Sequence, residues 1–174
     1  MPHDGQREHG WLVIGFLLLG ILARLVPHPP NVTPLVAIAL FGGTYGSKRW
    51  AVLLPLLIVA ASDLVLGWHD TIPFTWGAFV LTGMLAWWLR AHPTALRIAV
   101  AAAASAFLFF VITNFGVWVA GTLYPRTAEG LWHCYVAAVP FFRNTLLGDL
   151  AYTAVFFGGY AAAASVTLAG HPSH

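Results

Sequence analysis

Charged and amide side chains occur within apolar stretches of this sequence, where they could bind a polar ligand. Arg143, Asn144 and Asp149 lie inside the run AVPFFRNTLLGDLAYTAVFFGGYAAAASV, which has the length and composition of a membrane-spanning helix. A charged side chain near the bilayer centre costs about 2.5–3.5 kcal/mol on insertion scales, so it usually faces the bundle interior and marks a ligand or ion pathway. This segment is therefore the strongest indication of a functional site.

Two further charges, Arg24 and Asp63, also lie within apolar runs. Helix rise places Asp63 and Arg143 at a similar depth, about 7–8 Å below the predicted outer helix ends, so these two side chains could meet. Asp149 lies deeper by about two helical turns. The two cations and two anions could simply hold helices together as ion pairs. Because desolvated ion pairs yield little net stability, we favour the binding of a polar ligand.

Amide and aromatic side chains extend this candidate site. Asn114 and Asn144 each offer donors and an acceptor, which suit an amide or heteroaromatic ligand or, equally, a hydrogen bond between helices. Aromatic residues gather near the predicted outer boundary, where anchoring at the membrane interface is the alternative to lining a pocket. The complete predicted substrate-binding set is Arg24, Asn31, Asp63, Trp68, His69, Asn114, Trp118, Tyr124, Arg143, Asn144 and Asp149.

Metal binding and catalysis have weaker support in the sequence. His28, His69, His133 and Cys134 fall in predicted outer loops and could ligate a metal-containing ligand, but their spacing matches no metal motif. The sequence contains no HExxH, GxSxG, P-loop or GxGxxG motif. We therefore predict no metal, no cofactor and no enzymatic activity. The alternative is a membrane-embedded enzyme in which Asp or His side chains serve as acid and base.

The elements that position these residues follow from composition. Of the 174 residues 59% are hydrophobic and only 8% are charged, and the mean hydropathy is +0.78. These values predict an all-α integral membrane protein, and six spans with short loops leave no room for a soluble domain. The eight Lys and Arg are scattered without a basic stripe, which argues against nucleic acid as a partner.

Short polar breaks divide the chain into about six transmembrane helices in a single domain. The predicted spans are residues 11–26, 33–45, 50–67, 72–89, 95–121 and 136–169. The first is read as a retained anchor, because no small-x-small cleavage site follows it. One side carries five Lys and Arg, Arg7 among them, and the other carries two. The positive-inside rule therefore predicts that both termini are cytoplasmic and that the candidate site opens outward from the cell inner (cytoplasmic) membrane.

Four blocks of the sequence resemble an uncharacterised family of short bacterial multi-pass membrane proteins. The blocks are RLVPHPPNVTPLVAIALFGGTYG, SDLVLGWHD, TNFGVWVAGTLYPRT and VPFFRNTLLGDLAYTAVFFG. That family is similar to the S components of energy-coupling factor (ECF) vitamin transporters, which are six-helix proteins that bind substrate from outside. The resemblance implies an S-component-like bundle and, as a partner, an ECF energising module made of a transmembrane subunit and ATPases. The first segment lacks the alanine-xxx-alanine pattern with which many S components dock on that module.

The leading interpretation is a substrate-binding membrane subunit for uptake of a small organic micronutrient, such as a vitamin or its precursor. Its expected partners are that ligand and the lipid bilayer. Two other classes stay open: the membrane-embedded enzyme, which would turn over a lipid-soluble substrate, and a membrane assembly factor, which would bind another protein and no small molecule.

Overall fold

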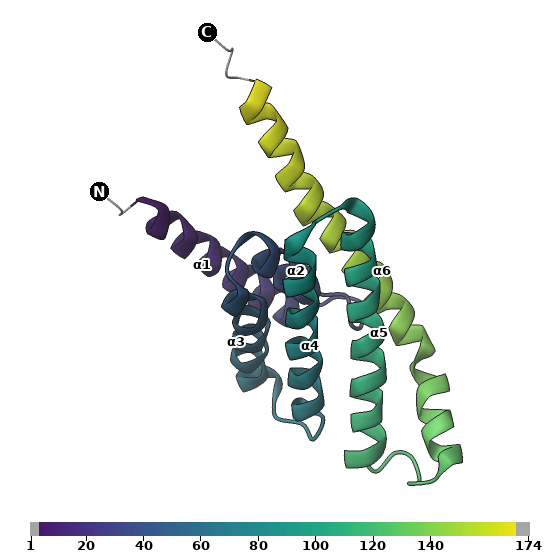
Figure 1. Ribbon diagram of the computed structural model, residues 1–174. Coiled ribbons are helices and arrows are strands. Elements are labelled where there is room, and N and C mark those ends of the chain that lie inside the picture. Colours follow the sequence, from purple (N-terminus) through teal and green to yellow (C-terminus); the bar gives the residue numbers. More distant parts are fainter. Residues whose placement is uncertain (1–3, 170–174) are drawn as a thin grey trace.

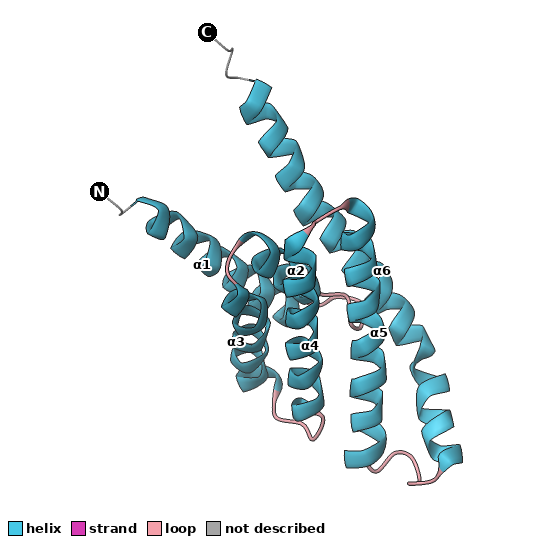
Figure 2. Ribbon diagram, in the orientation of Figure 1, coloured by secondary structure: helices cyan, strands magenta, loops and turns pink. Residues whose placement is uncertain are grey.

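The computed structural model describes residues 4–169, which form six helices and no strand (Figures 1 and 2). The helices are α1 (Asp4–Leu25), α2 (Leu35–Tyr45), α3 (Lys48–Leu66), α4 (Ile72–Ala91), α5 (Ala95–Ala120) and α6 (Ala128–Ala169).

Several helix ends follow from local chemistry. The Thr94 hydroxyl accepts a hydrogen bond from the backbone N–H of Arg97 at 3.3 Å and so caps the start of α5. Proline occupies the first turn of α4, where its missing N–H has no partner to lose. At the end of α3, Gly67 adopts a φ of 97°, the left-handed conformation that only glycine adopts readily.

Two helices, the first and the last, begin seven or eight residues earlier than the sequence predicts. The first helix begins at Asp4 rather than at residue 11. Arg7 thus lies within this helix, and its side chain is outside the described part of the structure. The last begins at Ala128 rather than at residue 136, so His133 and Cys134 lie in α6 and not in an outer loop. Loss of hydropathy marks where a helix leaves a membrane, and a helix with a polar first turn continues past that point. A hydrogen bond of 3.1 Å from the Gly130 N–H to the Thr127 hydroxyl supports the early start of α6.

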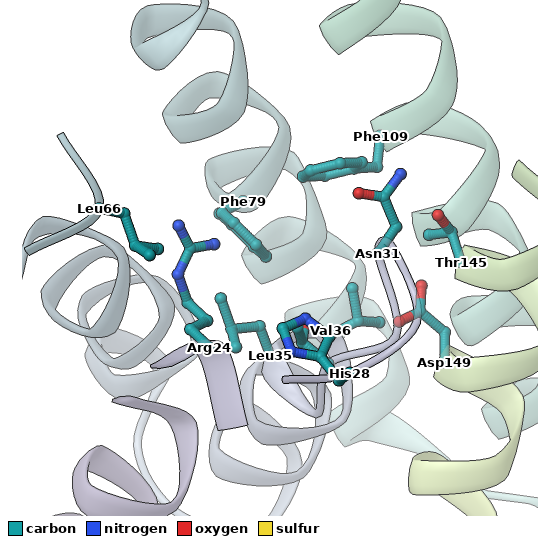
Figure 3. Close-up of a pocket in the computed structure, with 11 residues that line it drawn as sticks. Arg24, His28, Asn31, Leu35, Val36, Leu66, Phe79, Phe109, Thr145 and Asp149 are labelled. Carbon is teal, nitrogen blue, oxygen red and sulfur yellow. The ribbon is translucent and has the colours of Figure 1, made fainter. Parts of the chain in front are cut away.

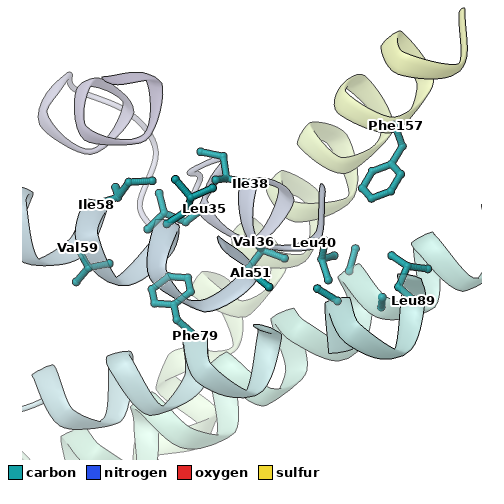
Figure 4. Close-up of a cluster of buried hydrophobic side chains, with 14 residues drawn as sticks. Leu35, Val36, Ile38, Leu40, Ala51, Ile58, Val59, Phe79, Leu89 and Phe157 are labelled. Carbon is teal, nitrogen blue, oxygen red and sulfur yellow. The ribbon is translucent and has the colours of Figure 1, made fainter. Parts of the chain in front are cut away.

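The short helix α2 forms the centre of the bundle. It contacts all five other helices, and each residue from Leu35 to Leu40 is at most 4% exposed (Figure 4). Close approach depends on Gly43, because a Cβ there would lie 2.5 Å from the Cβ of Ala51 and 2.6 Å from that of Ala86. With 11 residues, α2 is about 16 Å long, roughly half of a hydrocarbon core. Residues 26–34 therefore occupy the space beyond its N-terminal end.

The two ends of α2 differ in how their backbone groups are satisfied. At the C-terminal end, the guanidinium of Arg90 donates to the carbonyl of Gly43 at 3.2 Å and to that of Gly46 at 2.7 Å. A cation there also complements the helix dipole. At the N-terminal end, Pro34 precedes the helix and no side-chain hydrogen bond caps it. A side chain therefore bonds the carbonyls at the C-terminal end of α2, and none caps the N–H groups at its N-terminal end.

The apolar surface of the helices indicates that the chain is a membrane protein. Four helical stretches are long and apolar enough to cross a membrane: Lys48–Leu66, Ile72–Ala91, Ala95–Ala120 and Ala128–Val166. Shorter apolar stretches are Gly10–Leu25 and Leu35–Tyr45. Many large apolar side chains on these helices are exposed, which is costly in water and normal in lipid. The span count of six and the side of each terminus stay predictions.

The connections alternate between two ends of the bundle. Figure 1 shows the α3–α4 and α5–α6 connections at one end, whereas the start of α1 and the end of α6 project from the other. We call the first of these the loop end. The residues predicted to form the site belong to helix segments near the loop end and to the α1–α2 connection, so topology brings them together.

Candidate functional site

An ion pair joins α1 to α3 near the site. Nη2 of Arg24 donates to Oδ1 of Asp63 at 2.7 Å, and Nε of Arg24 donates to the hydroxyl of Ser62 at 2.6 Å. The Arg24 side chain is 19% exposed and that of Asp63 is 3% exposed. The expected meeting of Asp63 with Arg143 is therefore wrong: Arg24 binds Asp63, and Arg143 is exposed.

Among residues 4–169, Asp149 differs from Asp63 in having no cationic partner. It lies on α6 and is 3% exposed, and its Oδ2 has no hydrogen-bond partner among the residues that the structure describes. An isolated buried carboxylate is strongly disfavoured unless a cation, a donor or a proton satisfies it. A proton, or a hydrogen-bond donor outside the described residues, can satisfy this carboxyl group.

Asp149 lines a cavity of about 190 Å³ between the α1–α2 connection and helices α4, α5 and α6. In Figure 3, Arg24 and Asp149 lie on opposite sides of the view, and the rings of Phe79 and Phe109 lie above the line that joins them. Those two rings have centroids 5.5 Å apart and are tilted by 56°. The lining residues are Arg24, His28, Asn31, Thr33, Leu35, Val36, Leu66, Phe79, Phe109, Thr145 and Asp149.

A second cavity of about 290 Å³ adjoins the first, and the two share Arg24, Asn31, Phe109 and Thr145. Pockets for small organic ligands usually measure about 300–1,000 Å³, a range that the two compartments reach together. The lining of the second cavity contains more hydroxyl and amide groups than that of the first. Its lining residues are Arg24, Asn31, His69, Thr75, Phe109, Phe110, Thr113, Asn114, Val117, Phe141, Phe142 and Thr145. Because the exposed loop residues His28, Asn31 and His69 belong to the linings, the cavities reach the surface near the loop end.

The α1–α2 connection is held in an unusual conformation beside both cavities. Asn31 has a φ of 64°, a left-handed conformation that asparagine tolerates better than other residues with a side chain. The Asn144 amide on α6 donates to the carbonyl of Pro30 at 3.3 Å, and the Val32 N–H donates to the carbonyl of Pro29 at 3.1 Å. These bonds fix the connection so that Asn31 faces the cavities.

The structure brings together only part of the predicted set. Five members line a cavity: Arg24, Asn31, His69, Asn114 and Asp149. Asp63 and Asn144 act one step away, through Arg24 and Pro30 respectively. The remaining four line neither cavity: Trp68, Trp118, Tyr124 and Arg143. Trp68 is 72% exposed, and the Trp118 indole N–H donates to the carbonyl of Pro125 at 3.0 Å, which suits interface anchoring.

Sequence reasoning missed the apolar and hydroxyl part of the lining. The missed residues are Thr33, Leu35, Val36, Leu66, Thr75, Phe79, Phe109, Phe110, Thr113, Val117, Phe141, Phe142 and Thr145. Thr145 carried a usable signal, because residues four apart share a helix face and Thr145 precedes the predicted site residue Asp149 by four. Phe79 carried none, since phenylalanines are common in apolar helices.

The possible metal ligands lie apart in the structure. Within residues 4–169, no group of three His, Cys, Asp or Glu side chains is placed to hold a metal ion. Cys134 is buried and its thiol donates to the carbonyl of Asn114 at 3.4 Å. The His69 ring nitrogen Nδ1 lies 2.7 Å from the hydroxyl of Thr71.

Comparison with known proteins identifies the family of the chain but no activity. Neither a curated protein nor a solved structure matches it. The resemblance to S components thus receives no support, whereas the resemblance to an uncharacterised family does. One family model, described as a family of unknown function (DUF6580), matches residues 5–170, which is nearly the whole sequence. The chain therefore belongs to this family of unknown function.

Proposed function

We propose that the chain is a substrate-binding membrane protein that admits a small polar organic molecule into the paired cavities from the loop end. The observation that carries this proposal is Asp149, a buried carboxylate whose Oδ2 lacks a partner among the described residues and which lines a cavity. Helix packing gains nothing from such a group. A bound ligand that donates to it accounts for its position.

The chemistry of the lining supports an organic ligand over a bare ion. Aromatic rings supply flat apolar walls, and hydroxyl, amide and charged groups supply direction, a combination that small-molecule pockets use. The metal ions that proteins commonly bind prefer several oxygen, nitrogen or sulfur ligands in one shell. Asp149 is the only carboxylate in either lining.

The distribution of charge supports an outward-facing site. Lys48, Arg49, Arg90 and Arg97 flank the connections opposite the loop end, whereas Arg126 is the single cation of the α5–α6 connection. The positive-inside rule then assigns the loop end to the outer face of the cell inner membrane and both termini to the cytoplasm. This orientation supports uptake of a micronutrient, and partnership with an energising module stays a prediction.

Native mass spectrometry of the protein, purified in mild detergent, tests the proposal. We expect a single small molecule to remain bound and to leave when the protein unfolds. Thr145→Phe should remove it, since Thr145 is buried and lines both cavities. Leu147→Phe, an exposed position on the same helix, is the matched control and should retain it.

Two results would contradict the proposal. The first is a ligand-free protein that also binds no member of a metabolite library. The second is equal retention of the small molecule by Thr145→Phe and wild type. Chemical turnover of the retained molecule by the purified protein would instead favour an enzyme.

A further inference from the structure

We infer that the ligand is bipolar: one end carries a cationic N–H group that donates a hydrogen bond to Asp149, and the other end carries an acceptor to which Arg24 and the N-terminal end of α2 donate. This inference rests on the proposed function, and it specifies the chemical class of the substrate. Three features support it: the balance of charge in the lining, the donors of Arg24 and α2, and the aromatic rings that line the same cavity.

The charges of the lining favour a cationic group of the ligand near Asp149. The charge of Arg24 is already offset by Asp63, whose Oδ1 it contacts at 2.7 Å. His28 and His69 are exposed loop residues that occur in the linings. The walls therefore carry one carboxylate, Asp149, without a compensating cation among the described residues. A ligand with an ammonium, amidinium or protonated ring nitrogen compensates it through a charge-assisted hydrogen bond.

The opposite side of the cavity presents donors. Arg24 uses Nε for Ser62 and Nη2 for Asp63. Its Nη1 makes no hydrogen bond to residues 4–169, and its side chain, 19% exposed, lines the cavity. Leu35 and Val36, from the first turn of α2, line the same cavity, and no side chain caps that helix end. Backbone N–H groups at an uncapped helix end favour a carbonyl, carboxylate or phosphate oxygen.

The space between the poles suits a flat, compact body. Phe79 and Phe109 line the same cavity as Arg24 and Asp149, and their tilted rings offer an aromatic surface to a planar group (Figure 3). Hydroxyls of Thr33 and Thr145 lie on the same lining and can bond to edge groups of a heterocycle. The expected ligand is therefore a nitrogenous ring or a similarly planar molecule with poles of opposite character.

Four commercially available probes of nearly equal size separate these features: 4-amidinobenzoate is bipolar, benzamidine is cationic, benzamide is neutral and benzoate is anionic. We expect wild-type protein in detergent, measured by ligand-observed NMR titration, to bind them with decreasing affinity in that order. Asp149→Asn keeps the shape of the side chain and removes its charge. It should weaken benzamidine binding by about tenfold or more and change benzamide binding by less than about threefold.

Asp70→Asn is the matched control, because Asp70 is an exposed aspartate of the α3–α4 connection that lines neither cavity. It should leave all four affinities unchanged. Wild-type protein that prefers benzoate, or that binds benzamidine and benzamide equally, would overturn the inference while leaving the proposed function intact. Binding of none of the four probes would instead count against the proposed function. If Asp149→Asn fails to fold, the order of affinities for wild type still decides the inference.

Discussion

The pair between Arg24 and Asp63 permits a prediction in which a second substitution repairs the damage of the first. Arg24→Met removes the cation and leaves the buried carboxylate of Asp63 without its partner at Oδ1, while its Oδ2 already lacks a partner among the described residues. Breaking a buried pair from one side costs about 3–5 kcal/mol, because an uncompensated charge remains. We expect a loss of this size in the free energy of unfolding.

Asp63→Asn alone should cost less. The amide keeps the shape of the carboxylate, its oxygen can still accept from Arg24, and Arg24 retains Ser62 as an acceptor at 2.6 Å. Replacing a charged acceptor by a neutral one costs about 1–2 kcal/mol. The double variant Arg24→Met/Asp63→Asn contains no buried charge at this position. It should therefore be more stable than Arg24→Met by about 1–3 kcal/mol, within the usual range of coupling energies.

The assay is reversible unfolding in mixed detergent micelles, with SDS as the titrant and the fluorescence of the eight tryptophans as the signal. Arg49→Met serves as the control, because Arg49 is exposed and its guanidinium lies 5.4 Å from the ring centroid of Trp50. Loss of an exposed contact of this kind costs about 0.5–1 kcal/mol. A double variant less stable than Arg24→Met would refute the reasoning, since it would mean that Asp63 is not a buried charge held by Arg24.

Three further predictions concern the connection, the core and the exposed cation. Asn31→Val should lower the free energy of unfolding by about 1–2 kcal/mol, because a branched residue resists the left-handed conformation. Asn31→Gly should fold normally and lose ligand affinity, and thermal unfolding and ligand titration of both variants check these results. Gly43→Ala should cost about 1–3 kcal/mol by overpacking against Ala51 and Ala86, while Gly77→Ala, with open space around it, should not destabilise the protein in the same unfolding assay. Arg143→Gln should leave ligand affinity within about twofold of wild type, since Arg143 is exposed and lines neither cavity. A loss of affinity of about tenfold or more, as expected for a direct charged contact, would show that Arg143 contacts the ligand.

Much of the fold follows from the sequence because helix formation in an apolar chain is a local matter. Hydropathy runs and polar breaks locate the six helices, and the ends of α4 and α5 carry proline and threonine signals. Hydropathy places the starts of α1 and α6 too late in the sequence, because a helix can extend beyond its apolar stretch. The central position of α2 depends on which helices pack together, and no local pattern in residues 35–45 predicts those contacts.

The candidate site was predicted in its location and only partly in its members. Intramembrane charge pointed to Arg24, Asp63 and Asp149, which the structure places in or beside the cavities. The same argument pointed to Arg143, which is exposed, because helix rise gives the depth of a residue and not the face on which it lies. Pairing depends on that face, and so Arg24 rather than Arg143 reaches Asp63.

The most direct measurement of the central claim is native mass spectrometry of wild type and Asp149→Asn, prepared in parallel under identical mild conditions. The cavity beside Asp149 predicts that wild type retains one small molecule of defined mass and that Asp149→Asn, though folded and equally monodisperse, retains little or none. Equal retention by the two proteins, or a wild type that carries no ligand and takes none from a metabolite library, would contradict it.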